Sequence, residues 1–162
     1  MAIIIRELQT QSQAQSRVVV EHGGRRLTAN VAGTPEQVRS ALGTELLVEI
    51  DYGFVHGSRV LDSDRPSEHG LYAEPSGFVR VVGMIHNVVD ISDTEAVVDI
   101  YLQTGPEFLC VKASELDSRP EIGDGLEVVL EDLCFHPTSW ASSTPPGDER
   151  QARGAGQQGD GD

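Results

Sequence analysis

The stretch Ile122-Gly123-Asp124-Gly125-Leu126-Glu127-Val128-Val129-Leu130-Glu131-Asp132 has a counterpart 80 residues earlier, Leu42-Gly43-Thr44-Glu45-Leu46-Leu47-Val48-Glu49-Ile50-Asp51-Tyr52. The two segments align without a gap, and His56 and His136 follow them at the same offset. Each copy is typical of a glycine turn that leads into a β-strand. Because a repeat at fixed spacing indicates a duplicated unit, we interpret the chain as mainly β, with two small β-barrels in tandem.

This interpretation divides the 162 residues into four parts. Residues 1–61 are expected to form the first barrel and residues 78–137 the second. Residues 62–77, which are rich in proline, glycine and polar residues, are expected to link them. Residues 138–162 are expected to be a disordered tail, because their composition cannot bury enough apolar surface to offset chain entropy. Within this tail, Trp140 is expected to pack back on the second barrel.

Local signals support strands and one short helix in the first unit. Gly23 and Gly24 separate two strand-like segments and supply the positive φ of a tight hairpin turn. Thr34-Pro35-Glu36-Gln37 matches a capping box with proline at the first helical position. A helix is therefore expected from Pro35 to about Leu42, ending at Gly43.

The second unit opens with a strand in which Gly83 is expected to form a bulge. Segments 97–102 and 108–113 then flank a second hairpin turn. Residues 114–121 contain Pro120 and are too short for a full helix.

This order of elements resembles the oligonucleotide/oligosaccharide-binding fold. The resemblance rests on Gly83, on the two glycine-initiated strands 43–48 and 123–128, and on the capping box. It implies five-stranded Greek-key barrels, in which hairpin loops border the ligand groove.

Composition and charge limit the functions to consider. Hydrophobic residues make up 38% of the chain, which suits two small cores, and the net charge is −14. Residues 76–138 carry 3 basic and 12 acidic side chains, a difference of −9. Such a field repels phosphate and attracts basic partners. The short apolar run at the N-terminus predicts neither a signal peptide nor a membrane span, so we expect a cytoplasmic protein without membrane contact.

No common enzyme motif is present, so we expect a protein that is not an enzyme and uses no cofactor or metal. Cys110 and Cys134 are expected to be buried free thiols. Cys134 and His136 share a strand face but supply only two ligands, which favours structural roles. Proline and serine at the fifth and sixth positions argue against a calcium loop at residues 62–67. A second acidic loop, at residues 90–95, is expected to be solvated rather than to bind a cation.

Two clusters are candidate binding residues. Arg17, His22, Arg25 and Arg26 lie at the tip and root of the first hairpin, where we favour a solubilising role; in the alternative function they would contact nucleic acid. Glu127, Glu131 and Asp132 lie in the repeated strand and would contact a protein partner.

The leading hypothesis is a non-catalytic binding or adaptor protein. Its acidic second barrel would bind a protein partner of basic character. The first alternative is a single-stranded nucleic-acid-binding protein, which the charge disfavours. The second is an acidic inhibitor or immunity-type protein for a basic partner. The sequence indicates no oligomeric state.

Overall fold

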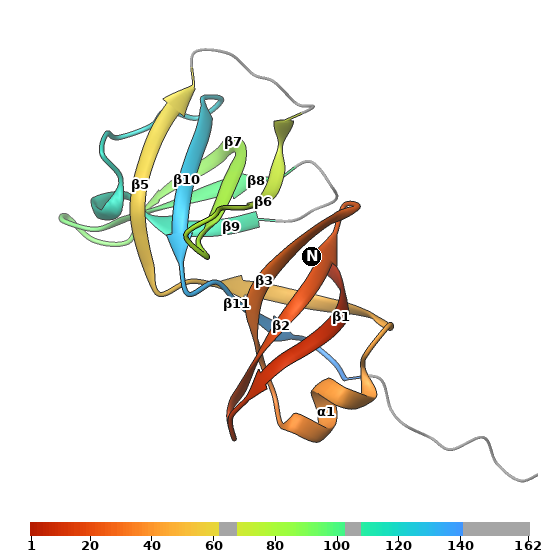
Figure 1. Cartoon of the computed structure of the whole chain (residues 1–162). Coiled ribbons are helices and arrows are strands. Elements are labelled where there is room, and N and C mark those ends of the chain that lie inside the picture. Colours follow the sequence, from red (N-terminus) through yellow and green to blue (C-terminus); the bar gives the residue numbers. More distant parts are fainter. Residues whose placement is uncertain (62–67, 103–107, 141–162) are drawn as a thin grey trace, which may run out of the picture.

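The structure is a computed structural model, and it describes residues 1–61, 68–102 and 108–140. The chain is mainly β, as predicted, and comprises one closed barrel, a second sheet and a short helix (Figure 1). In the described residues, no helix is both long enough and apolar enough to cross a membrane. The tail from residue 141 onward and the calcium-like loop at residues 62–67 lie outside the described residues.

The closed barrel contains five strands and carries the helix at the end away from the second sheet (Figure 1). Around the barrel the strands follow one another in the order β1 (Ala2–Gln11), β2 (Gln15–His22), β3 (Arg25–Ala32), β11 (Cys134–Pro137) and β4 (Glu45–Asp51). The helix α1 (Pro35–Ser40) lies between β3 and β4 in sequence. β11 runs parallel to β3, and the other neighbours in the barrel are antiparallel.

The second sheet is open. Its strands follow in the order β5 (Phe54–Leu61), β10 (Gly125–Glu131), β7 (Val79–Asp90), β8 (Ala96–Tyr101) and β9 (Phe108–Lys112). β6 (Gly70–Ala73), which lies in the expected linker, pairs with part of β7. The 3₁₀ turn η2 (Ala113–Glu115) follows β9. β5 and β9 are the two ends of this sheet, and they do not pair with each other, so the sheet does not close into the second barrel that the sequence predicted.

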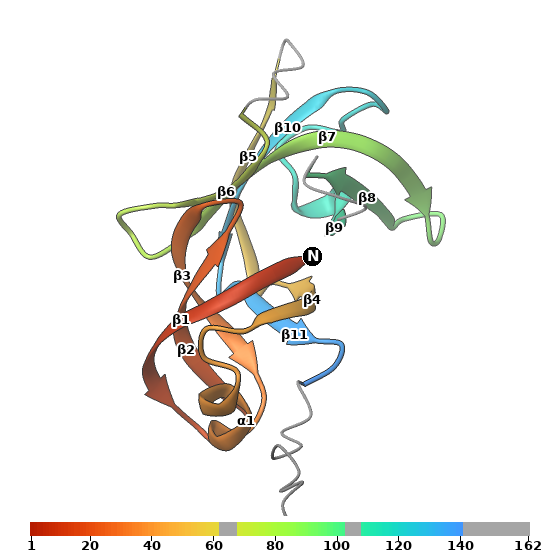
Figure 2. The same cartoon turned by 90° about the vertical axis from the view of Figure 1, so that its right-hand side faces the viewer.

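The strands also group differently from the expected segments 1–61 and 78–137. β5 follows β4 directly but pairs with β10, and β11 follows β10 directly but closes the barrel. The chain thus crosses between the two sheets at residues 52–53 and again at residues 132–133 (Figures 1 and 2). At the crossing, the Gly53 N–H donates to the Glu131 carbonyl at 3.1 Å. A Cβ on Gly53 would lie 3.0 Å from the Asp132 Cβ, so glycine permits the close passage.

The two sheets share a pairing register at an offset of 80 residues. β1 and β7 also interrupt their ladders at matching places, between Ile5 and Glu7 and between Ile85 and Asn87. The matched pairs are Ala2–Leu47 with Val82–Glu127, Ile5–Val20 with Ile85–Ile100, and Asp51–Cys134 with Glu131–Phe54. The last match compares β4–β11 pairing with β10–β5 pairing. In both cases the second strand directly follows a strand of the other sheet in sequence.

Several local predictions can be checked directly. Gly23 and Gly24 have φ of 55° and 75°, as the hairpin turn requires. The capping box of α1 is formed in both directions, although the helix ends at Ser40. Gly83 is not at a bulge: a Cβ there would lie 2.6 Å from the Tyr101 carbonyl oxygen, so this glycine allows β7 to approach β8 closely.

The buried core runs through both sheets. β11 contributes Phe135, which is fully buried in the barrel, and β6 contributes the buried Leu71. Trp140 packs on the barrel, not on the second sheet as expected, because the chain that precedes it is β11. Its ring occupies the space where a Cβ on Gly33 would stand.

Candidate functional site

The first hairpin does not present a free basic surface. The Arg25 guanidinium lies 4.3 Å from the centroid of the Tyr72 ring, and its Nη1 donates to the His69 carbonyl at 3.4 Å. Arg80 lies over the same ring at 4.4 Å. A cation over an aromatic face is attracted by the ring quadrupole, so Arg25 joins the hairpin to β6 of the second sheet.

The other predicted basic residues are also engaged or dispersed. Arg26 pairs with Glu21 at 3.5 Å, and Arg6 pairs with the same carboxylate at 3.0 Å. The Arg6 hydrogen bond is the main reason why the pKa of Glu21 lies below its usual value. His22 is buried, with Nδ1 2.8 Å from the Ala2 carbonyl oxygen. Arg17 is half-buried on β2, so the four residues do not form one exposed cationic groove.

Two of the predicted acidic residues, Glu127 and Glu131, lie in β10, and Asp132 lies in the chain crossing that follows it. Glu127 contacts Arg59 at 3.1 Å and Arg80 at 3.3 Å, which neutralises it within the sheet. Glu131 is half-buried opposite Phe54. Asp132 is exposed and has a φ of 54°. The structure therefore does not gather these three side chains into one free acidic surface.

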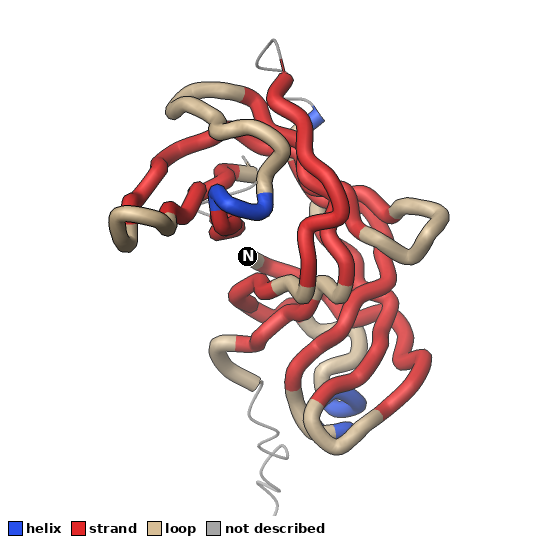
Figure 3. The backbone as a smooth tube through the Cα atoms, turned by 90° about the vertical axis from the view of Figure 1, so that its left-hand side faces the viewer, coloured by secondary structure: helices blue, strands red, loops and turns tan. Residues whose placement is uncertain are grey.

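Side chains bridge the gap between β5 and β9 where main-chain pairing is missing. The Tyr52 hydroxyl accepts from the Lys112 N–H at 3.2 Å and donates to Glu115 at 2.6 Å. Burial, followed by the bond to Glu115, raises the pKa of Tyr52, so the phenol remains protonated. Asp117 accepts from the Ser58 N–H at 2.9 Å. One end of the gap is thus closed by hydrogen bonds, and Figure 3 shows the turn that supplies them beside the sheet.

A cleft lies beside this bridge and has a volume of about 360 Å³. We call it the edge cleft. It is lined by Asp51, Tyr52, Gly53, Val97, Cys110, Lys112 and Glu115. Residues 51–53, at the first chain crossing, line one part of the cleft, and residues of β8 and β9 line the other. The sequence did not predict that these segments lie side by side.

Carboxylates are frequent in the chain that forms β8, β9 and the turns beside them. In the described parts of residues 90–119, six acidic side chains face two basic ones, which gives 2 − 6 = −4. Lys112 contacts Glu95 only loosely, at 3.9 Å, and Arg119 contacts Asp90 at 3.3 Å on the exposed surface. Exposed pairs of this kind are screened by solvent. We call this set the acidic edge: Asp90, Asp93, Glu95, Asp99, Glu115 and Asp117.

The cysteines and histidines do not combine into a reactive centre. Cys110 is exposed, contrary to expectation, and donates to Asp99 at 3.0 Å. Partial burial and then Asp99 raise the pKa of its thiol to about 11, so at neutral pH the nucleophilic thiolate is scarce. Cys134 is half-buried, and the neighbouring His136 is exposed. Within residues 1–61, 68–102 and 108–140, no three metal-ligating side chains gather at one place.

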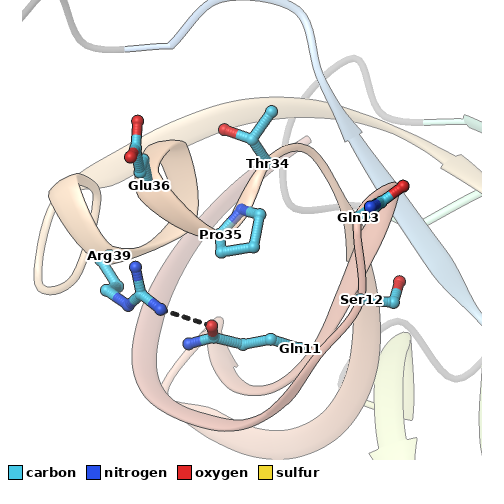
Figure 4. A pocket seen from close by; sticks show the side chains of 7 residues that line it. All are labelled: Gln11, Ser12, Gln13, Thr34, Pro35, Glu36 and Arg39. Carbon is cyan, nitrogen blue, oxygen red and sulfur yellow. Dashed lines mark hydrogen bonds between the residues drawn. The ribbon is translucent and has the colours of Figure 1, made fainter.

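A second hollow lies between the β1–β2 turn and α1, with a volume of about 610 Å³. Figure 4 shows Gln11, Ser12 and Gln13 on one side and the start of α1 on the other. Arg39 donates to the Gln11 side chain at 2.5 Å across it. The hollow presents side-chain amide and hydroxyl groups that can form hydrogen bonds.

Comparison with known protein families and with curated proteins finds no match to this chain.

Proposed function

We propose that this chain is a non-catalytic protein-binding module that contacts a partner of basic character through the acidic edge. The observation that carries the proposal is that the second sheet is open at β9, next to a cleft that Asp51 and Glu115 line and beside the acidic edge. An open sheet edge exposes main-chain groups that can pair with another chain. A negative surface favours approach of a positively charged partner.

The disposition of the arginines disfavours single-stranded nucleic-acid binding. Such binding needs a cationic groove with aromatic stacking platforms. Here Arg25 and Arg80 are placed over Tyr72, and Arg26 and Arg59 are paired with carboxylates. The Tyr72 ring, which could otherwise stack a base, is therefore already in contact with two cations of the same chain.

The shared register supports a finer proposal about the fold. We propose that the chain consists of two related units of the oligonucleotide/oligosaccharide-binding type, which exchange their last strands. The offset of 80 residues holds for pairs in three different ladders of each sheet. The first unit closes, whereas the second leaves β9 available.

Matched charge reversals test the proposed surface. Asp90→Lys with Asp93→Lys changes two exposed residues of the acidic edge. Glu45→Lys with Glu49→Lys makes the same charge change on exposed positions of β4. Quantitative affinity capture from the native host should lose its bound proteins with the first variant and keep them with the second. Equal capture by both variants would contradict the assignment of the surface.

Fluorescence anisotropy with labelled single-stranded DNA and RNA tests the alternative. We expect no binding tighter than roughly micromolar at physiological salt, the level of non-specific contact. Nanomolar, salt-sensitive binding that is lost in an Arg17→Glu, Arg26→Glu variant would instead support a nucleic-acid-binding protein.

A further inference from the structure

The main chain of β9 has a defined outward side. The Lys112 N–H donates to the Tyr52 hydroxyl, so the main chain of Lys112 points away from β8. Main-chain groups alternate in direction along an antiparallel strand, so those of Cys110 point the same way as those of Lys112. The main-chain N–H and C=O of Leu109 and Val111 point toward β8, where these residues pair with Ile100 and Val98. β9 therefore directs the N–H and C=O of Cys110 away from its own sheet.

The corresponding edge in the barrel is occupied. There β11 pairs with β3 in a parallel ladder at Asn30 and Val31. In the second sheet, β9 forms the end of the strand order, and among the described residues no strand lies against its outward side. Tyr52 accepts from the Lys112 N–H, whereas the outward N–H and C=O of Cys110 lie two residues before that contact. This is the geometry by which an extended segment adds to a sheet.

The flanks of β9 define the chemistry of such a segment. On the outer face, the edge cleft places Asp51 and Glu115 near Cys110, and Asp99 accepts from the Cys110 thiol. Lys112 is the single cation of that cleft. On the inner face, Leu109 and Val111 are fully buried in the core. Because successive side chains of a strand point to opposite faces, a matching segment alternates basic and apolar residues.

We propose that β9 binds, by strand addition, an extended segment of a partner protein in which basic and apolar residues alternate. This inference rests on the proposed protein-binding function and names the mode of binding and the class of ligand. Main-chain hydrogen bonds to Cys110 provide attachment, and the carboxylates of the edge cleft select the basic side chains.

The probe is a short fluorescein-labelled peptide in which lysine and valine alternate, and the readout is anisotropy. Cys110→Pro removes an N–H that does not bond to β8, so it is compatible with an edge strand. Cys110→Val changes the same side chain and keeps the N–H. Because both variants lose the thiol and only one loses the N–H, we expect Cys110→Pro to bind the peptide at least about tenfold more weakly than Cys110→Val. Unchanged affinity in a folded Cys110→Pro protein would overturn strand addition.

Two modified peptides test the same point on the wild-type protein, whether or not Cys110→Pro folds. One carries N-methyl groups on the lysine amides and the other on the valine amides. Strand addition requires that only one of them binds, because alternate amides face β9. Equal binding of both, or no binding of the unmodified peptide, would refute it.

The outcomes also separate this inference from the proposed function. If the Asp90→Lys, Asp93→Lys variant loses captured protein while both methylated peptides bind the wild type equally, the acidic edge is the binding surface and strand addition is wrong. If those charge reversals leave captured protein unchanged, the proposed surface fails, whatever the peptide does.

Discussion

Replacing Phe135 by alanine tests the source of the fifth barrel strand. Phe135 is fully buried in β11, between Val31 of β3 and Ile50 of β4. Truncating a buried phenylalanine costs about 3–5 kcal/mol, because apolar contacts are lost and a cavity remains. Small domains have total unfolding free energies of only about 5–15 kcal/mol. Phe135→Ala should therefore remove a large share of the stability, and the melting temperature should fall by about 10 °C.

Phe54→Ala is the control, because it makes the same truncation at the start of β5, the other strand that follows a chain crossing. Its side chain is 55% exposed, so its truncation should cost less than about 1 kcal/mol. Urea unfolding can be followed by circular dichroism and by Trp140 fluorescence, which reports on the barrel near Gly33. If Phe135→Ala unfolds like the wild type, or if the two variants lose equal stability, β11 does not complete the barrel core.

Three further changes test other parts of the structure. Gly70→Ala should cost about 1–3 kcal/mol in urea unfolding, because Gly70 has a φ of 136° and a Cβ would meet a guanidinium nitrogen at 2.6 Å; Gly57→Ala, at a site with open space, should cost little. Alkylation of Cys110 by iodoacetamide, mapped by mass spectrometry, should be slow at pH 8 and accelerate toward pH 11. Asp99→Asn should speed that reaction at pH 8, because it removes a charge that opposes the thiolate. Deleting residues 144–162 should leave the melting temperature nearly unchanged, since their composition offers no packing face, and a drop of several degrees would contradict this.

Local features of the fold were predictable because a few neighbouring residues determine them. The paired glycines at residues 23–24 allow the tight turn, and the hydroxyl and amide of Thr34 and Gln37 cap α1. The alternation of aliphatic residues in β4 and β10 correctly indicated strands. These signals concern the conformation of a segment, and they carry little information about its neighbours.

The pairing of β5 and β11 shows where local signals end. β5 follows β4 after two residues, and β11 follows β10 after two residues. Both strands carry a histidine at the matched position. Whether each returns to its own sheet or enters the other depends on residues 52–53 and 132–133 and on packing far away in sequence. Alternation predicts which side chains face inward, but it does not predict which sheet the strand joins.

The candidate site was less predictable for the same reason. Arg25 is at a hairpin tip in the sequence, yet its exposure depends on Tyr72, which is 47 residues away. Glu127 belongs to an acidic strand, yet Arg59 and Arg80 neutralise it. The net negative charge of residues 76–138 predicts only the sign of their surface, because charge sums do not depend on pairing. Which carboxylates remain unpaired could be seen only in the tertiary structure.

The two chain crossings have a mechanical consequence for the open edge. Two residues separate β10 from β11, so the sheet that carries β9 is held by a strand whose continuation is packed in the barrel. In the same way, β5 continues from β4, and Tyr52 between them bonds to the end of β9. Unfolding either sheet therefore withdraws a strand from the other. A single exposed edge strand would be a weak platform on an isolated open sheet, whereas here the barrel anchors β5 and β10 and supports the sheet that presents β9.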